Sequence, residues 1–181
     1  MLNSKTEAFE FVKSLDAPSH LLTHVTLVGE AADLLINKCE QLLLKIDPEF
    51  VRVGVIIHDV GKIKHPNEMS GPGSEHEPSG ERLLLEKGIS EKIARCCLSH
   101  ARWDQMECSI EELLIALSDK LWKGKRVEQL ELLVIDRIST MLDKERWDIY
   151  QELDSHFELI ASSGDQRLER SMIPSIKPQT T

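Results

Sequence analysis

The 181-residue sequence has no long uncharged apolar run. No stretch approaches the roughly 20 apolar residues that a membrane span requires. Residues 1–6 lead into an amphipathic segment instead of the apolar stretch of a signal peptide. We therefore expect neither a membrane span nor a signal peptide, and a cytoplasmic location.

Paired cysteine motifs are also missing. None of the four cysteines has C-x-x-C spacing, and two of them are sequence neighbours that are poorly placed to pair with each other. We predict that they are small buried hydrophobic side chains in a reduced compartment. The four are Cys39, Cys96, Cys97 and Cys108.

The sequence has no excess of basic residues, since its formal net charge is −9. Binding along a nucleic acid or an anionic membrane requires clustered Lys and Arg, so we expect no broad binding of either kind. A local basic patch could still hold a small phosphate. The length and the 41% hydrophobic content predict one globular domain with a substantial core.

Strand patterns and internal repeats are nearly absent, whereas helical periodicity is frequent. We therefore predict an all-α single domain over residues 1–162, with its motifs at about 20–125. A flexible tail is expected over 163–181, and the longest irregular stretch over 64–80, where Gly and Pro are frequent. Helices are expected at about 4–15, 20–36, from Asp47, from 81 to 88, from Ser90, from Ser109, and over 127–142 and 145–161.

One apolar run, Val51–Ile57, leads directly into His58-Asp59. Buried polar groups are costly unless they are paired or bind a metal, so two adjacent candidate ligands at this place suggest a site. The pair alone is a weak signal. Gly61 and Lys62 follow, and Gly61 is expected to end or bend the helix.

Further candidate ligands are distributed along the chain. At 100° per residue, His24 falls within an apolar helical stripe. Asp119 lies opposite the leucine stripe of its own helix, so that helix is either covered on two sides or presents Asp119 to solvent. Imidazole and carboxylate together suit Mn, Fe, Co, Ni or Zn. The six candidates are His24, His58, Asp59, His76, His100 and Asp119.

Several residues have simpler interpretations. We interpret His20, His65 and His156 as ordinary core or surface histidines. Asp119-Lys120 could be a solvated helix surface. Similarly, Lys123, Lys125 and Arg126 could form a solvated C-terminal turn, where cations are favoured by the helix dipole.

The order His24, His58-Asp59, Asp119 resembles the H…HD…D signature of the HD-domain superfamily of metal-dependent phosphohydrolases. Residues 57–62 (Ile-His-Asp-Val-Gly-Lys) are similar to its HD-x-G-K form. His76 and His100 look like the two extra histidines of dinuclear members. Residues 117–121 resemble the last-ligand helix, with Ser118 where Ala is frequent. The resemblance implies a helical bundle with the metal centre in its core.

By this resemblance, His24, His58, Asp59 and Asp119 would bind a first divalent metal. His76 and His100 would bind a second, with Asp59 shared. One or two ions of Mn, Fe, Co, Ni, Zn or Mg are implied. A metal lowers the pKa of bound water, and hydroxide held there would attack a phosphate ester or anhydride.

The resemblance implies a small phosphorylated substrate, with a nucleotide as the leading class. Lys62 is predicted to contact a phosphate oxygen as a point charge, and Asp59 and Lys62 are the candidate catalytic residues. The second predicted phosphate contact comprises Lys123, Lys125 and Arg126.

Two alternatives remain open. Some small superfamily members with six such ligands resemble mixed-valent di-iron oxygenases, which also act on anionic substrates. A non-catalytic signalling module is the third class, but such modules generally lack several ligands, and all six are present here.

Overall fold

Every regular element in residues 2–172, the part of the chain that the structure describes, is a helix, as predicted. The structure is a computed structural model. Its elements are α1 (Lys5–Ser14), α2 (Ser19–Gln41), α3 (Pro48–Ile57), η1 (Val60–Ile63), η2 (Pro66–Met69), α4 (His76–Glu86), α5 (Glu91–Ala94), α6 (Cys96–Ser99), α7 (Ile110–Leu121), α8 (Glu128–Leu142), α9 (Arg146–Ser162) and α10 (Gly164–Met172), where η denotes a 3₁₀ helix.

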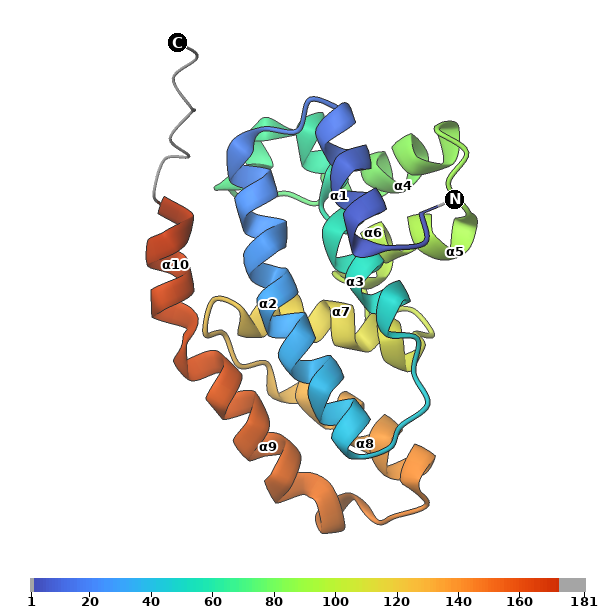
Figure 1. Ribbon diagram of the computed structural model, residues 1–181, viewed down its shortest axis with the longest axis vertical. Coiled ribbons are helices and arrows are strands. Elements are labelled where there is room, and N and C mark those ends of the chain that lie inside the picture. The colour runs from blue at the N-terminus through green and yellow to red at the C-terminus, as the bar shows by residue number, and fades with distance from the viewer. Residues whose placement is uncertain (1, 173–181) are drawn as a thin grey trace.

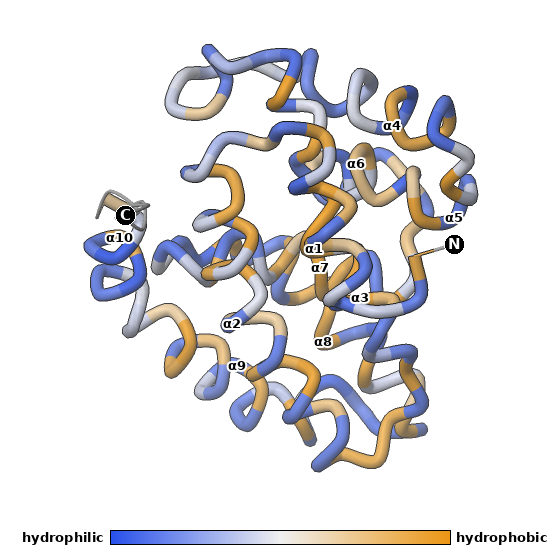
Figure 2. The backbone as a smooth tube through the Cα atoms, turned by 45° about the horizontal axis from the view of Figure 1, so that its top comes forward, coloured by the Kyte–Doolittle hydropathy of each residue, from blue (hydrophilic) through white to orange (hydrophobic). Residues whose placement is uncertain are grey.

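Helices α2, α3 and α7 pack against one another and form the centre of the bundle (Figure 1). Their contact faces are fully buried, with Leu21 and Val25 on α2, Ile56 on α3, and Leu113 and Leu117 on α7. Figure 2 shows hydrophobic stretches on these central helices, whereas α10 is mostly hydrophilic. Burial of apolar area is the main force that holds such helices together.

Two predicted helix starts are confirmed by their caps. The Asp47 side chain accepts a hydrogen bond from the backbone N–H of Phe50 at 3.0 Å, and Pro48 occupies the first turn of α3. Ser109 and Glu112 form a reciprocal capping box at the start of α7. Both caps satisfy backbone N–H groups that would otherwise lack partners.

The segment 64–90 is more helical than its composition suggests. The expected loop contains η2, and α4 begins at His76 instead of at residue 81. Pro78 lies in the first turn of α4, where a missing N–H costs no hydrogen bond. The helix expected from Ser90 is divided into α5 and α6.

Gly61 allows α4 to approach η1. A Cβ at position 61 would overlap the carbonyl oxygen of His76 and lie 2.6 Å from the backbone nitrogen of Gly80. These are backbone atoms that cannot move aside. Gly61 does not end α3, which stops at Ile57; its role is this close contact.

Part of the expected tail is a helix. Residues 164–172 form α10, which packs on α2 and α9. Arg167 is buried and donates hydrogen bonds to the carbonyls of Ile160 and Trp122, while Arg170 forms an ion pair with Glu30 of α2. These polar contacts hold a helix whose sequence lacks an apolar stripe, so hydrophobic periodicity did not reveal it. Positions 173–181 of the expected tail lie outside the described residues.

Within residues 2–172, none of the helices combines the length and apolar character needed to cross a membrane.

Candidate metal centre

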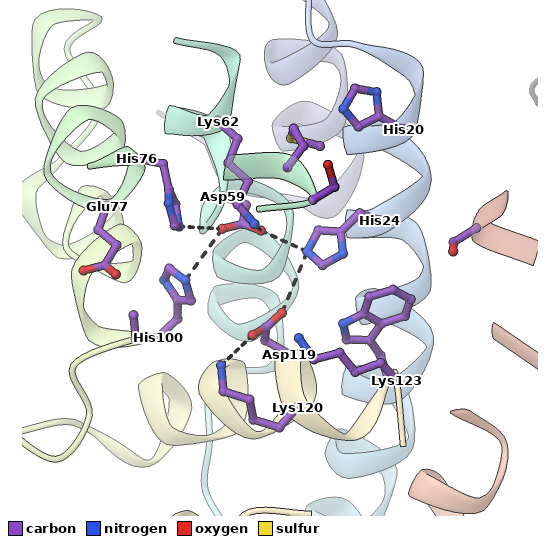
Figure 3. A pocket seen from close by; sticks show the side chains of 15 residues that line it. His20, His24, Asp59, Lys62, His76, Glu77, His100, Asp119, Lys120 and Lys123 are labelled. Atoms are coloured by element: carbon purple, nitrogen blue, oxygen red, sulfur yellow. Dashed lines mark hydrogen bonds and ion pairs between the residues drawn. The ribbon is translucent and has the colours of Figure 1, made fainter. Parts of the chain in front are cut away.

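The structure brings all six predicted ligands together. Figure 3 shows five of them around the cavity, namely His24, Asp59, His76, His100 and Asp119. The six come from five places in the fold: the second turn of α2, the residues after α3, the start of α4, the residue after α6, and α7. In chain order they are His24, His58, Asp59, His76, His100 and Asp119.

Burial answers the question that periodicity left open for α7. Asp119 is 7% exposed, so α7 is covered on two sides and its carboxylate faces the interior. His58, Asp59, His76 and His100 are buried as well. A cluster of polar side chains at this depth requires mutual pairing or a bound ion.

Asp59 lies between two pairs of imidazoles. Its Oδ2 is 3.0 Å from His24 Nε2 and 3.4 Å from His58 Nε2. Its Oδ1 is 3.2 Å from His76 Nε2 and 3.7 Å from His100 Nε2. Each carboxylate oxygen therefore faces its own histidine pair, which is an arrangement suited to a shared ligand.

Asp119 faces only one of these two histidine pairs, the pair formed by His24 and His58. Its Oδ1 lies 3.8 Å from His24 Nε2 and 3.7 Å from His58 Nε2. We call His24, His58, Asp119 and Asp59 Oδ2 the first half-site, and His76, His100 and Asp59 Oδ1 the second half-site. The ligand atoms of His24, His58 and Asp119 lie within 4.8 Å of one another, as do those of His58, Asp59 and His100.

Hydrogen bonds orient three of the histidines. The Nδ1 of His58 is 2.7 Å from Val55 O, and that of His100 is 3.1 Å from Cys96 O. The Nδ1 of His76 is 2.5 Å from Glu68 Oε2. In each case Nδ1 is the donor, so Nε2 is the nitrogen directed at the carboxylates.

Charges in the cluster are strongly coupled. Burial opposes ionisation of Asp59 and Asp119, but His58 and the other facing groups hold both carboxyl pKa values well below the usual range. Burial also opposes a charge on His58, yet the two carboxylates raise the pKa of His58 to about 9. The first half-site therefore attracts positive charge.

His100 differs. Burial, followed by repulsion from His58, lowers the pKa of His100 to about 3, so His100 is neutral at physiological pH. A neutral imidazole is the form that binds metals. Converging imidazole nitrogens and ionised carboxylates fit a divalent first-row metal, and the clusters could hold one.

Three lysines lie beside the ligands. Lys62 Nζ is 2.6 Å from Asp59 Oδ2, and Lys120 Nζ is 2.7 Å from Asp119 Oδ2. Lys123 is half-buried, and burial lowers the pKa of its ammonium group although Asp119 opposes this. All three line the same cavity.

The other two predicted phosphate contacts do not line this cavity. Arg126 pairs with the carboxylates of Glu131, Asp154 and Glu158, which hold it against α8 and α9. Lys125 is exposed. The sequence showed a basic cluster but not the acidic partners that face Arg126.

The cavity has a volume of about 590 Å³, which is within the range of small-molecule sites. Its polar floor is the ligand cluster and its walls come from α2, η2, α4, α7 and α10 (Figure 3). The lining residues are His20, His24, Asp59, Lys62, Met69, Ser70, His76, Glu77, His100, Ala101, Asp119, Lys120, Trp122, Lys123 and Ser171.

Sequence reasoning missed several of these residues. His20 received an ordinary interpretation but lines the cavity, and its position one turn before His24 was the available signal. Trp122 lies edge-on to His24, with ring centroids 5.0 Å apart. Ser171, which lines the cavity, and Glu68, which contacts His76, had no recognisable signal, because their positions depend on how α10 and η2 pack.

Other simple interpretations are supported. His65 pairs with Ser79 Oγ at 2.7 Å, and His156 pairs with Leu34 O at 3.1 Å, both outside the ligand cluster. All four cysteines are buried and free, as predicted. Burial raises the pKa of the Cys39 thiol to about 11, so it stays protonated.

Comparison with known proteins agrees with this geometry. The profile of the family described as HD domain matches residues 21–123, which include all six candidate ligands. An uncharacterized protein of Methanocaldococcus jannaschii is 28% identical over 138 residues, covering 67% of this chain and 78% of its own. No solved structure matches the chain significantly.

Proposed function

Since the chain belongs to the HD-domain family, we propose that it is a metal-dependent phosphohydrolase acting on a small phosphate ester or anhydride. A nucleotide is the first class to test. The observation that carries the proposal is Asp59, whose two oxygens face separate histidine pairs at 3.0–3.7 Å. A ligand shared in this way suits two ions acting on one phosphate.

The first half-site would hold one divalent ion and the second half-site another. When bound, such ions supply Lewis-acid polarisation of a phosphoryl oxygen and acidify water. The protein supplies the orientation: α2, α3 and α7 hold their ligands rigidly, and Nδ1 hydrogen bonds keep the Nε2 atoms of His58, His76 and His100 directed inward.

Lys62 is proposed to bind the phosphate. Its ammonium group can only donate hydrogen bonds, and it lies at the junction of a metal ligand and the cavity. Lys120 and Lys123 add positive charge on the α7 side. In a protein of net charge −9, three lysines on one cavity suit an anionic ligand.

The test is phosphate release from a panel of nucleotides and simple phosphoesters, run with Mn²⁺, Co²⁺, Fe²⁺ and Mg²⁺. We expect turnover of at least one substrate class with wild-type protein and none with Asp59→Asn. Oxygen consumption by Fe²⁺-loaded protein without phosphate release, together with an EPR signal from a coupled mixed-valent iron pair, would indicate the oxygenase alternative. Metal binding without either reaction would indicate a non-catalytic module.

A further inference from the structure

His76 is held differently from the other oriented histidines. His58 and His100 donate to backbone carbonyls three and four residues earlier in their own helical segments, namely Val55 O and Cys96 O. His76 instead pairs with a side-chain carboxylate, that of Glu68 on η2. Its orientation therefore depends on a separate segment of the chain.

Glu68 is well placed to impose that orientation. Its Oε2 is 2.5 Å from His76 Nδ1 and accepts a further hydrogen bond from His76 N at 3.1 Å, while its Oε1 accepts one from Glu75 N at 3.2 Å. The side chain is only 11% exposed. One carboxylate thus holds both the start of α4 and the imidazole on it.

The segment around Glu68 also forms part of the cavity. Met69 and Ser70, the next two residues, line the cavity. Gly73 approaches the Glu68 side chain so closely that a Cβ there would overlap the carboxylate. Residues 64–75, which we call the η2 loop, therefore connect the cavity wall to His76.

We propose that Glu68 is the positioning residue of the second half-site, and that it couples divalent-cation binding at that half-site to the conformation of the η2 loop. A carboxylate partner on Nδ1 holds the ring with Nε2 facing Asp59 Oδ1 and makes the imidazole a stronger donor to a cation. Because coupling is reciprocal, a cation bound by His76 stabilises the η2 loop in turn.

This inference rests on the metal centre within the proposed function, but it does not depend on the reaction. Wild-type protein that binds two ions and hydrolyses no phosphoester contradicts the proposed function and leaves the role of Glu68 intact. Wild-type protein that binds only one ion contradicts this inference, whether or not it is a phosphohydrolase.

The experiment compares Glu68→Gln and Glu68→Ala with Glu75→Gln as a matched control. Glu75 belongs to the same loop, its side chain is exposed, and its substitution changes the charge equally. Co²⁺ binding is followed by visible absorption and elemental analysis, and circular dichroism verifies the fold. Trypsin cleavage after Lys64, which is exposed, reports on the η2 loop with and without Co²⁺.

We expect Glu68→Gln to weaken binding of the second ion by about 10- to 100-fold and to leave the first ion unchanged. Glu68→Ala should weaken it further, because the acceptor itself is lost. Co²⁺ should slow cleavage after Lys64 in wild type and Glu75→Gln, and much less in both Glu68 variants. The proposal is overturned if Glu68→Gln and Glu68→Ala bind both ions with wild-type affinity. It is also overturned if Co²⁺ does not change the rate of cleavage after Lys64 in the wild-type protein.

Discussion

The two half-sites share Asp59 but are built in different ways. The first half-site takes its other ligands from α2, α7 and the end of α3, the helices that form the centre of the bundle. The second takes His76 from the first residue of α4 and His100 from the end of the four-residue helix α6. One is part of the core, whereas the other depends on short elements.

This difference has a thermodynamic consequence. Displacing His24 or Asp119 requires opening the packed core, which costs much of the stability of the whole domain. Displacing His76 requires only that the η2 loop and the first turn of α4 separate from η1. The first half-site is therefore expected to be preformed, and the second to be the place where binding and local order depend on each other.

The largest expected effect comes from Asp59→Ala, which should disrupt both half-sites. It removes the carboxylate that faces all four histidines. We expect loss of both metal ions by elemental analysis and loss of turnover. Full metal occupancy in this variant would show that the ligand assignment is wrong.

Gly61→Ala should disrupt the second half-site and leave the first intact, although it replaces no ligand. The new Cβ would overlap backbone atoms of α4, and we expect a loss of unfolding free energy of roughly 1–3 kcal/mol and of the second ion.

Gly29→Ala is the control, because its Cβ would meet nothing closer than Lys5 Nζ at 3.5 Å. In the middle of α2 it should gain up to about 1 kcal/mol in chemical denaturation. Equal effects of the two substitutions would contradict the steric role of Gly61.

His100→Ala tests whether the centre is dinuclear. It should lower the metal content from about two ions to about one, while circular dichroism shows an intact fold. His156→Ala is the matched control, since His156 pairs with Leu34 O outside the ligand cluster and its loss should leave the content unchanged. A wild-type chain that holds one ion, unchanged by His100→Ala, would indicate a mononuclear site.

Lys62→Ala should preserve metal content and impair the reaction. Removing a single charged group that stabilises a phosphate typically lowers kcat/KM by about 10²- to 10³-fold. Lys64→Ala, a nearby exposed lysine, should keep full activity. If folded Lys62→Ala protein lost its metal, the ammonium group would have the role of holding Asp59 in place instead of binding the phosphate.

The smallest effect on the reaction is expected from replacing the lysines that follow α7. Lys123→Ala should raise KM several-fold, because Lys123 lines the cavity. Lys125→Ala should leave KM unchanged, since that side chain is exposed and away from the lining. Steady-state kinetics of the two variants distinguish a specific contact from a general effect of positive charge.

Much of this protein is determined by its sequence alone. Caps at Asp47 and Ser109 and the helical spacing of apolar residues predict the central helices within a few residues. The His58-Asp59 pair at the end of an apolar run, with His24 on an apolar stripe, predicts that polar ligands meet in the core. These features are local, so periodicity and capping chemistry are sufficient to detect them.

Only the tertiary structure decided what covers each face. Asp119 is buried because α7 is packed on two sides, and Arg126 faces away from the cavity because three carboxylates of α8 and α9 surround it. Glu68 pairs with His76 across an irregular segment of the chain. Helix α10 packs through Arg167 and Arg170, and the ion pair of Arg170 joins it to α2, which is far away in the sequence. Periodicity identifies an apolar face, but the partner of a polar side chain is set by long-range packing that no local pattern encodes.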